Sequence, residues 1–259
     1  MRRLLLAVVL SLPGLGLPVQ ADAPDHALFT QILTTHVQKG LVDYDALARD
    51  ERLTRYLAQI AATEPETLTS DNEKLAFWLN AYNAYTLKLI LERRPNRSIQ
   101  EIGPKTTTPA KDDKTSAWDI RFAQVGRRTY TLNEMEHEVI RRTFRDARVH
   151  FALNCASGSC PELRPEAYEA ETLGKQLDDQ GRQFLADNAR NRFDLETKTA
   201  WLSSIFDWYR RDFGESERTV LRRAAQYAPE AVRTSIQSNP EAWTVKYLDY
   251  DWTLNAKKP

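Results

Sequence analysis

The spacing of hydrophobic residues along the chain predicts a protein made mainly of helices. In most segments the apolar residues recur three and four positions apart, as they do on one face of an α-helix. Ser70 and Glu73 form a capping box at the start of the longest of these segments, which stops before Pro95. The expected helices cover residues 27–39, 45–62, 74–94, 132–144, 167–188, 205–213, 216–227 and 229–237.

A second pattern, in which apolar residues alternate with others, predicts a few short strands. The residues on either side of Val125-Gly126 are expected to form a hairpin, and residues 149–154 a buried strand that carries His150. Two strands near residues 193–202 and a last strand at 245–250 complete the set. The expected fold class is therefore α+β, mainly helical, with a small, mostly antiparallel sheet built from the hairpin, the His150 strand and the C-terminal strands.

The first 21 residues have the pattern of a secretory signal peptide. Arg2 and Arg3 precede an apolar run, and Val19 and Ala21 meet the small-residue rule for cleavage after Ala21. The apolar run is too short to span a bilayer as a stable helix. We therefore expect a periplasmic or secreted protein with no stable membrane insertion after cleavage, in which residues 22–259 form a single globular domain.

Charge and motif content narrow the range of functions. The chain has 36 basic and 36 acidic side chains, and loss of Arg2 and Arg3 with the leader leaves 34 basic against 36 acidic ones. This balance gives no electrostatic reason to expect a nucleic-acid partner. The sequence contains no glycine-rich phosphate loop, no dinucleotide-binding fingerprint and no paired CxxC motif, so we expect neither a cofactor nor a structural zinc ion.

The reactive residues are densest between His150 and Cys160. This segment holds one of the four histidines and both cysteines, Cys155 and Cys160. Residues 156–159 are small, so their backbone N–H groups are expected to approach an anion closely, and Pro161 suits the first turn of a following helix. A cysteine just before a helix lies in a field that favours the thiolate. Two cysteines this close in an oxidising compartment also favour a disulfide, and the sequence leaves both readings open.

Four further polar residues fall on helix faces that are expected to be buried or partly buried. Asn80 and Asn83 lie three positions apart on the flank of the apolar stripe of helix 74–94, which predicts a buried polar network or a structural tie to a neighbouring loop. Glu136 falls inside the apolar stripe of helix 132–144. Such a carboxylate suits an acid–base residue, an orienter of a histidine or a structural salt bridge. His137 lies on the adjacent face, where a surface position is equally compatible.

Several segments together resemble the family known as domain of unknown function 547. They read FWLNAYNAYTLKLI, YTLNEMEHEVIR, DARVHFALNCASGSCPELRPEAY, IFDWYRRDF and YDWTLN, and they span about residues 76–255, in the same order as in the family. The resemblance picks out the following residues of this chain: Asn80, Asn83, Glu136, His137, His150, Cys155, Cys160, Pro161 and Trp252. It implies membership of that family and no particular activity. Together with the leader pattern of residues 1–21, it makes an exported bacterial member of the family the expectation.

The first functional hypothesis is a thiol enzyme that performs hydrolysis or acyl transfer on an amide-like substrate of the cell envelope. Cys160 or Cys155 attacks, His150 or His137 accepts the proton, and Glu136 or an asparagine orients the imidazole. The backbone N–H groups of residues 156–160 stabilise the oxyanion. Substrate-binding roles are assigned to Asn80, Asn83, Asn154, Ser159 and Trp252. All four histidines precede both cysteines, so the chain order differs from that of papain-like enzymes.

The second hypothesis is a binding module for a small molecule or a peptide-like ligand. A Cys155–Cys160 disulfide then fixes the shape of the loop, since a bridge over so short a loop contributes only about 2 kcal/mol to stability. In this reading His150, Asn80 and Asn83 are structural hydrogen-bonding residues. A third possibility is a metal site built from Glu136, His137, His150 and a cysteine, but the histidine spacing matches no standard zinc pattern.

Overall fold

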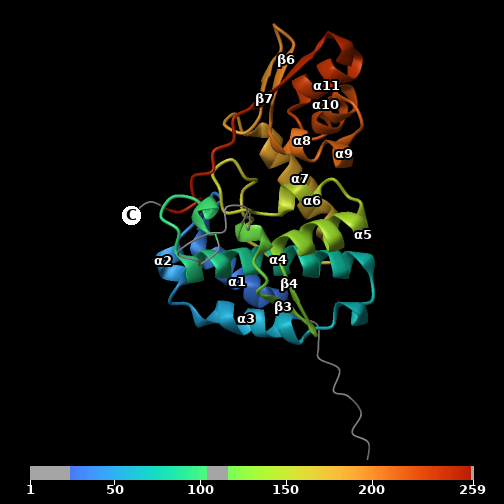
Figure 1. Cartoon of the computed structure of the whole chain (residues 1–259). Coiled ribbons are helices and arrows are strands. Elements are labelled where there is room, and N and C mark those ends of the chain that lie inside the picture. Colours follow the sequence, from blue (N-terminus) through green and yellow to red (C-terminus); the bar gives the residue numbers. More distant parts are fainter. Residues whose placement is uncertain (1–23, 104–115, 258–259) are drawn as a thin grey trace, which may run out of the picture.

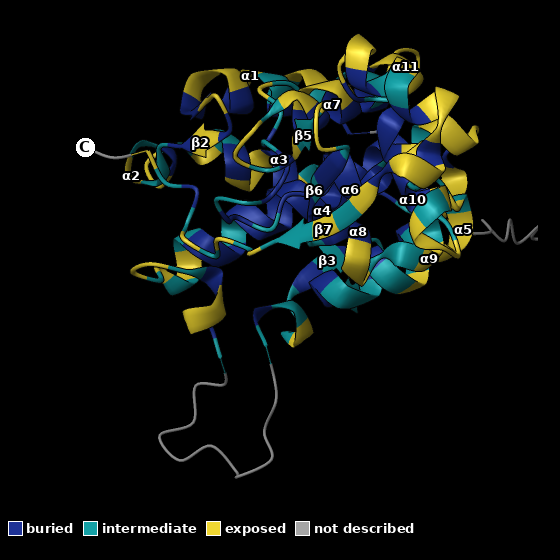
Figure 2. Cartoon of the chain, turned by 90° about the horizontal axis from the view of Figure 1, so that it is seen from above, coloured by how far each residue is buried: buried dark blue, intermediate teal, exposed yellow. Residues whose placement is uncertain are grey.

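The long helix α4 (Asp71–Arg93) lies in the middle of the helices of the N-terminal half (Figure 1). The computed structural model describes residues 24–103 and 116–257. The capping box is confirmed, because the Ser70 hydroxyl accepts a hydrogen bond from the backbone N–H of Glu73 at 3.1 Å and the Glu73 carboxylate accepts one from the N–H of Ser70. Every residue from Leu75 to Ile90 except Lys88 is buried, so α4 is surrounded by protein on all sides rather than along one stripe (Figure 2).

Shorter elements are arranged around α4 and continue into the C-terminal half. The other α-helices are α1 (His26–His36), α2 (Tyr44–Leu47), α3 (Glu51–Ala62), α5 (Arg142–Phe144), α6 (Val149–Ala152), α7 (Leu173–Ala186), α8 (Ile205–Trp208), α9 (Arg210–Phe213), α10 (Glu217–Ala225) and α11 (Glu230–Ser238). A π-helix, Glu134–Arg141, leads directly into α5. Short 3₁₀-helices occur at Pro65–Thr67, Ile99–Glu101, Ala117–Asp119 and Pro240–Ala242.

The strands form three small sheets. They are β1 (Val37–Gln38), β2 (Leu41–Val42), β3 (Ala123–Val125), β4 (Arg128–Tyr130), β5 (Arg192–Asp194), β6 (Thr199–Ser203) and β7 (Thr244–Leu248). β1–β2, β3–β4 and β5–β6 are antiparallel pairs, and β7 runs parallel to β6. The α+β, mainly helical fold class is confirmed, as are the hairpin around Val125-Gly126 and the predominance of antiparallel pairs. The single sheet that we expected is not formed: within residues 24–103 and 116–257 the strands make three separate sheets.

The predicted strand around His150 is wrong, because these residues form the helical turn α6. Two hydrogen bonds start the turn: the backbone N–H of Arg148 donates to the Asp146 carboxylate at 2.9 Å, and that of His150 donates to the carbonyl of Ala147 at 3.2 Å. All four residues of α6 are buried. A short run that is buried on every side has no exposed face, so its sequence pattern does not separate a helical turn from a strand.

The helix expected soon after Cys160 also begins later than predicted. α7 starts at Leu173, and residues 161–172 form an irregular segment instead. Asn80 holds this segment against α4, because its side-chain amide donates to the carbonyl of Tyr168 and accepts from the N–H of Tyr168, both at 2.8 Å. Cys160 therefore does not lie at a helix N-terminus, and no helix dipole stabilises a thiolate there.

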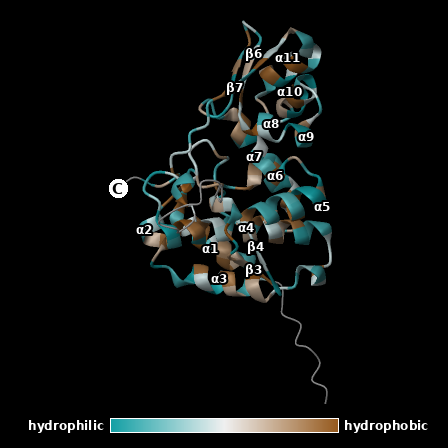
Figure 3. Cartoon of the chain, viewed as in Figure 1, coloured by the Kyte–Doolittle hydropathy of each residue, from teal (hydrophilic) through white to brown (hydrophobic). Residues whose placement is uncertain are grey.

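Two hydrophobic clusters build the molecule. The first joins α1, α3 and α4 with β3 and the π-helix, and the second joins β6 with α8, α10 and α11. In Figure 3, hydrophobic residues occur in both the N-terminal helices and α10–α11. α6 lies between the two clusters: Val149 belongs to the first and Phe151 to the second. The segment that carries His150 and the cysteines is thus held at the junction of the two cores.

The close packing of α7 at this junction predicts a difference between its two glycines. A Cβ atom added at Gly181 would lie 2.7 Å from Cδ1 of Tyr227 and 3.1 Å from Cδ2 of Phe151, whereas one added at Gly174 would meet nothing within 4 Å. Gly181→Ala should lower the free energy of unfolding by about 1–2 kcal/mol, because the overlap outweighs the gain in helix propensity. Gly174→Ala, the control, should leave it unchanged or raise it slightly. Urea unfolding of both variants tests this, and equal effects would contradict it.

The predicted signal peptide, residues 1–21, lies outside the described residues. Within the part that the structure describes, no helix has the length and apolar character needed to cross a membrane.

Candidate functional site

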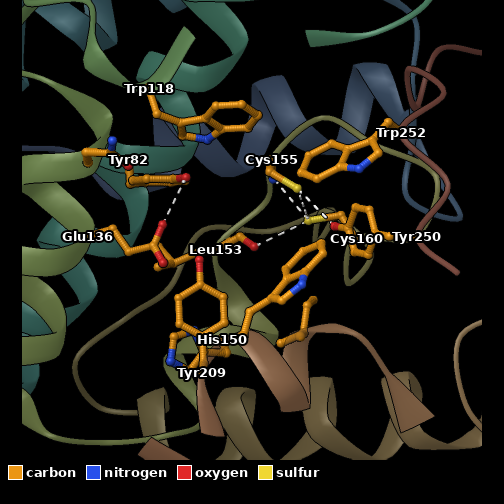
Figure 4. A pocket seen from close by; sticks show the side chains of 13 residues that line it. Tyr82, Trp118, Glu136, His150, Leu153, Cys155, Cys160, Tyr209, Tyr250 and Trp252 are labelled. Atoms are coloured by element: carbon orange, nitrogen blue, oxygen red, sulfur yellow. Dashed lines mark hydrogen bonds between the residues drawn. The ribbon is translucent and has the colours of Figure 1, made fainter. Parts of the chain in front are cut away.

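A pocket of about 260 Å³ at the junction of the two cores brings together much of the reactive chemistry of the chain (Figure 4). Its walls come from α4, the 3₁₀-helix Ala117–Asp119, the π-helix, α6 and the loop after it, α8, and the chain that follows β7. The lining residues are Tyr82, Trp118, Asn133, Glu136, His150, Leu153, Cys155, Cys160, Ile205, Trp208, Tyr209, Tyr250 and Trp252. Five of the residues predicted from sequence are therefore neighbours here: Glu136, His150, Cys155, Cys160 and Trp252.

The two cysteines form one hydrogen-bonded pair. Their Sγ atoms lie 3.0 Å apart, and both thiols are free. The sulfur of Cys155 is also 3.2 Å from the hydroxyl of Ser157 and 3.1 Å from that of Tyr250. Cys160, only 2% exposed, has its sulfur 3.6 Å from the carbonyl oxygen of Leu153, an acceptor that only a protonated thiol can use.

These contacts distinguish the two sulfurs electrostatically. The hydrogen bond with Cys160 is the main cause of a lowered pKa at Cys155; burial opposes it, and the hydroxyls of Ser157 and Tyr250 add to it. Burial raises the pKa of Cys160 well above its ordinary value. When the pair loses one proton, the negative charge is therefore located on Cys155, and Cys160 keeps its proton.

The loop between the cysteines does not offer the oxyanion site expected from its small residues. The backbone N–H groups of Ala156, Gly158, Ser159 and Cys160 already donate within the protein, to Asn154 Oδ1 and to the carbonyls of Thr253, Asp251 and Ser157, respectively. The N–H of Cys155 donates to the sulfur of Cys160 at 3.0 Å. The expected backbone anion site over residues 156–160 is therefore not formed as predicted, because four of its five N–H donors are already used. Those of Gly158 and Ser159 attach the loop to the C-terminal segment, and those of Ala156 and Cys160 form bonds within residues 154–160.

Glu136 is the buried carboxylate of the pocket, 6% exposed. The hydroxyl of Tyr82 donates to its Oε2 at 3.4 Å, and Figure 4 shows the Tyr209 side chain beside it. Burial and the charge of Glu136 both raise the pKa of Tyr82, and the same two causes, with a hydrogen bond to Glu136, raise that of Tyr209. Both tyrosines therefore remain protonated and able to donate to this carboxylate.

His150 bonds to Asp212 rather than to a thiol. Its Nε2 lies 2.7 Å from Oδ2 of Asp212, which also accepts from Nε of Arg141 at 2.6 Å. Burial alone would raise the pKa of Asp212, but the bonds with His150 and Arg141 outweigh it and lower that pKa below its usual range. The His150 ring stacks on Tyr209 with 3.9 Å between the ring centroids. His150 therefore fixes the position of Tyr209, the residue that contacts Glu136.

His137 lies outside the pocket lining. Its side chain is 37% exposed, and its Nδ1 is 2.7 Å from a guanidinium nitrogen of Arg141 and 3.9 Å from Oε1 of Glu136. Among residues 24–103 and 116–257, neither His137 nor His150 forms a hydrogen bond with a cysteine. The imidazole–thiol pair suggested by the sequence is replaced here by a thiol–thiol pair.

The predicted substrate-binding amides hold the backbone together behind the pocket. Asn83 donates to the carbonyl of Ala152 at 3.0 Å and accepts from the N–H of Asn154 at 2.9 Å. Asn154 in turn donates to the carbonyl of Pro161 at 2.9 Å and accepts from the N–H of Ala156. The hydroxyl of Ser159 accepts from the N–H of Asp251. Like Asn80, none of these side chains lines the pocket.

The aromatic part of the site was missed by sequence reasoning. Trp208 and Tyr209 were assigned to a core helix, yet both line the pocket, and Trp208 is 50% exposed. The other lining residues that were missed are Tyr82, Trp118, Asn133, Leu153, Ile205 and Tyr250. One signal was present: aromatic residues adjacent in sequence, as at 208–209, point in different directions on a helix, so they are not all accommodated in one core face.

Comparisons with known proteins reach only part of this site. No curated protein and no solved structure gave a significant match to the chain. One family model matches residues 65–185, which carry Glu136, His150 and both cysteines, while the pocket residues 205–252 lie beyond the match. That model is described as "Protein of unknown function, DUF547", and the match supports a domain of this family over residues 65–185 of the chain.

Proposed function

We propose that this protein is a thiol-dependent enzyme that hydrolyses or transfers the acyl group of an amide-like or ester-like substrate, with Cys155 as its nucleophile. The observation that carries the proposal is the environment of the Cys155 sulfur. It faces a pocket, it has three hydrogen-bonding partners within 3.2 Å, and its pKa is lowered. A thiolate stabilised at an accessible position is the usual form of a catalytic cysteine.

The reaction follows from the groups around that sulfur. The Cys155 thiolate attacks the carbonyl carbon, a C–S bond forms, and the carbonyl π electrons move to oxygen. The tetrahedral intermediate then collapses, the bond to the leaving nitrogen or oxygen breaks, and that atom takes a proton from the Cys160 thiol or the Tyr250 hydroxyl, which lie 3.0 and 3.1 Å from Cys155. The product of this half-reaction is a thioester on Cys155.

Glu136 is suited to the second half-reaction. Its carboxylate faces the same pocket and has tyrosine hydroxyls as partners, so it is placed to take a proton from a water or an acceptor hydroxyl. The oxygen attacks the thioester carbon, the C–S bond breaks, and Cys155 leaves as the thiolate. The proton held by Glu136 returns to the donor used in the first step, so the enzyme is regenerated.

The test is covalent labelling followed by intact mass and peptide mapping. After reduction and removal of the reductant, iodoacetamide at pH 7 should modify Cys155 much faster than Cys160. p-Nitrophenyl acetate should release p-nitrophenol in a burst and leave an acetyl group on Cys155. Cys155→Ser should abolish both adducts, while Cys160→Ser, which keeps a hydroxyl donor at that position, should retain them.

Two results would count against the proposal. One is modification of Cys155 only at the rate of the urea-unfolded protein, because an activated thiolate must react faster than a free cysteine. The other is release of p-nitrophenol that is unchanged in Cys155→Ser, because the acyl group would then be transferred elsewhere.

The distance between the sulfurs favours a second candidate function, a binding module whose loop is fixed by a Cys155–Cys160 disulfide. The two Sγ atoms are 3.0 Å apart, so oxidation needs only a small movement. The intact mass of protein purified without reductant decides between the thiol enzyme and the binding module. A mass two hydrogens lower, with labelling of both cysteines only after reduction and denaturation, favours the binding module.

We also propose that the protein is exported to the periplasm or secreted. The support is the leader pattern of residues 1–21, with Ala21 at the expected cleavage position. N-terminal sequencing of the protein recovered from the extracytoplasmic fraction should start at Asp22, and recovery of an uncleaved chain from the cytoplasm would refute it.

A further inference from the structure

The walls of the pocket consist largely of aromatic rings. Trp208 and Trp252 stack with 5.8 Å between centroids and 16° between planes, and Trp118 meets Trp252 edge-on at 5.8 Å. Tyr250 packs 4.7 Å from Trp208 and 4.6 Å from Trp252. Tyr82 lines another part of the pocket (Figure 4). Aromatic faces carry partial negative charge, so such walls attract a cation as well as apolar groups.

The charged groups of the pocket are all anionic or already paired. Glu136 contributes a buried carboxylate and Cys155 a thiol with a lowered pKa. His150 is bonded to Asp212. No lysine or arginine is among the lining residues in the part of the chain that the structure describes. Arg141, whose charge acts on Glu136, bonds to Asp212 and His137 and stacks over Tyr209 at 4.8 Å.

We propose that the pocket binds a cationic ammonium group of the substrate, with Glu136 as its counter-ion and the tryptophans as its walls. The inference rests on the proposed function, because it places the ammonium on the leaving group of the acyl substrate that the Cys155 thiolate would attack. Departure of that group frees Glu136 to act as the base of the second half-reaction. The hydrogen-bonding partners of the Glu136 carboxylate are tyrosine hydroxyls, and the imidazole of His137 lies farther away, 3.9 Å from Oε1. A buried carboxylate in such surroundings is stabilised by an incoming positive charge. A purely apolar acyl chain would fill the aromatic walls but would bring no positive charge to that carboxylate.

The test uses two probes of the same shape, choline and 3,3-dimethylbutan-1-ol, in which a neutral carbon replaces the quaternary nitrogen. Binding is followed by tryptophan fluorescence, since Trp208 is half exposed at the pocket. Choline should bind saturably, and the neutral alcohol at least about tenfold more weakly, which corresponds to about 1.4 kcal/mol. Glu136→Gln should weaken choline binding about tenfold and the alcohol little.

Glu138→Gln is the matched control, because Glu138 lies on the same π-helix but is exposed and pairs with Arg142. It should leave both affinities unchanged. Glu136→Gln is accepted only if its urea midpoint matches that of the wild type. Trp208→Ala, at an exposed position, is the second variant and should also weaken choline binding.

Equal affinities for the two probes, or no saturable change with choline up to about 10 mM, would overturn the inference. The outcome is separable from that of the proposed function, since no carbonyl compound is present. Choline selectivity without acylation of Cys155 would refute the thiol enzyme and leave the cation site. Acylation of Cys155 without choline selectivity would do the reverse.

Discussion

Replacing Asn83 with alanine should lower the free energy of unfolding by about 3 kcal/mol. Its amide is 3% exposed and satisfies two backbone groups of the α6 segment, the carbonyl of Ala152 and the N–H of Asn154. Alanine lacks the amide, so both backbone groups lose their hydrogen-bonding partner at once. Each buried backbone group left without a partner costs about 1–3 kcal/mol. Urea unfolding measures the loss.

Asn72→Ala is the control for this substitution. Asn72 is on the same helix and also donates to a backbone carbonyl, that of Ala170 at 3.3 Å, but it is exposed to solvent, which can replace the bond. Its effect should stay within about 0.5 kcal/mol. A second measurement is the labelling of Cys160 by iodoacetamide in the folded protein. Labelling should be slow in the wild type and faster in Asn83→Ala. If Asn83→Ala had the same stability and the same slow labelling as the wild type, Asn83 would not be a structural tie.

The fold could be predicted from sequence where local signals agree with the tertiary environment. The Ser70–Glu73 capping box and the apolar positions after it locate α4 to within a few residues. The hairpin could be predicted because a glycine marks its turn, and the structure shows why glycine suits that position: Gly126 has a positive φ of 53°. The segment around His150 was assigned wrongly because a buried helical turn of four residues, Val149–Ala152, carries too few positions to establish a period.

The candidate site could be predicted only in part, and the reason lies in distance along the chain. Cys155, Cys160 and His150 cluster in sequence, so their proximity in space was expected. Tyr250 contacts the sulfur of Cys155 across 95 residues, and Asp212 contacts His150 across 62. An aromatic or acidic residue in a distant segment has the same pattern whether it faces the core or a pocket, so the partner that determines each reactive group was not visible.

Replacing Cys160 with alanine should raise the pKa of the Cys155 thiol and clearly slow its alkylation at pH 7. The hydrogen bond with Cys160 is the main cause that lowers this pKa, so its loss moves the pKa toward the ordinary value of about 8.5. Only the thiolate reacts, so the rate at a pH below the pKa falls as the pKa rises. Cys160→Ser retains a hydroxyl donor and should restore most of the rate.

Tyr250→Phe should produce a smaller shift in the same direction, because its hydroxyl, 3.1 Å from the sulfur, contributes less than Cys160. Tyr247→Phe is its control, since Tyr247 lies on β7 three residues earlier and does not line the pocket. The measurement is the rate of iodoacetamide labelling of Cys155 from pH 5 to pH 10, in the wild type and in the two Cys160 and two tyrosine variants. The wild-type midpoint should lie lowest, followed by Tyr250→Phe and then Cys160→Ala. A wild-type midpoint at the ordinary cysteine value, unmoved by Cys160→Ala, would mean that the pair does not activate Cys155, and the sulfur contacts would then be structural.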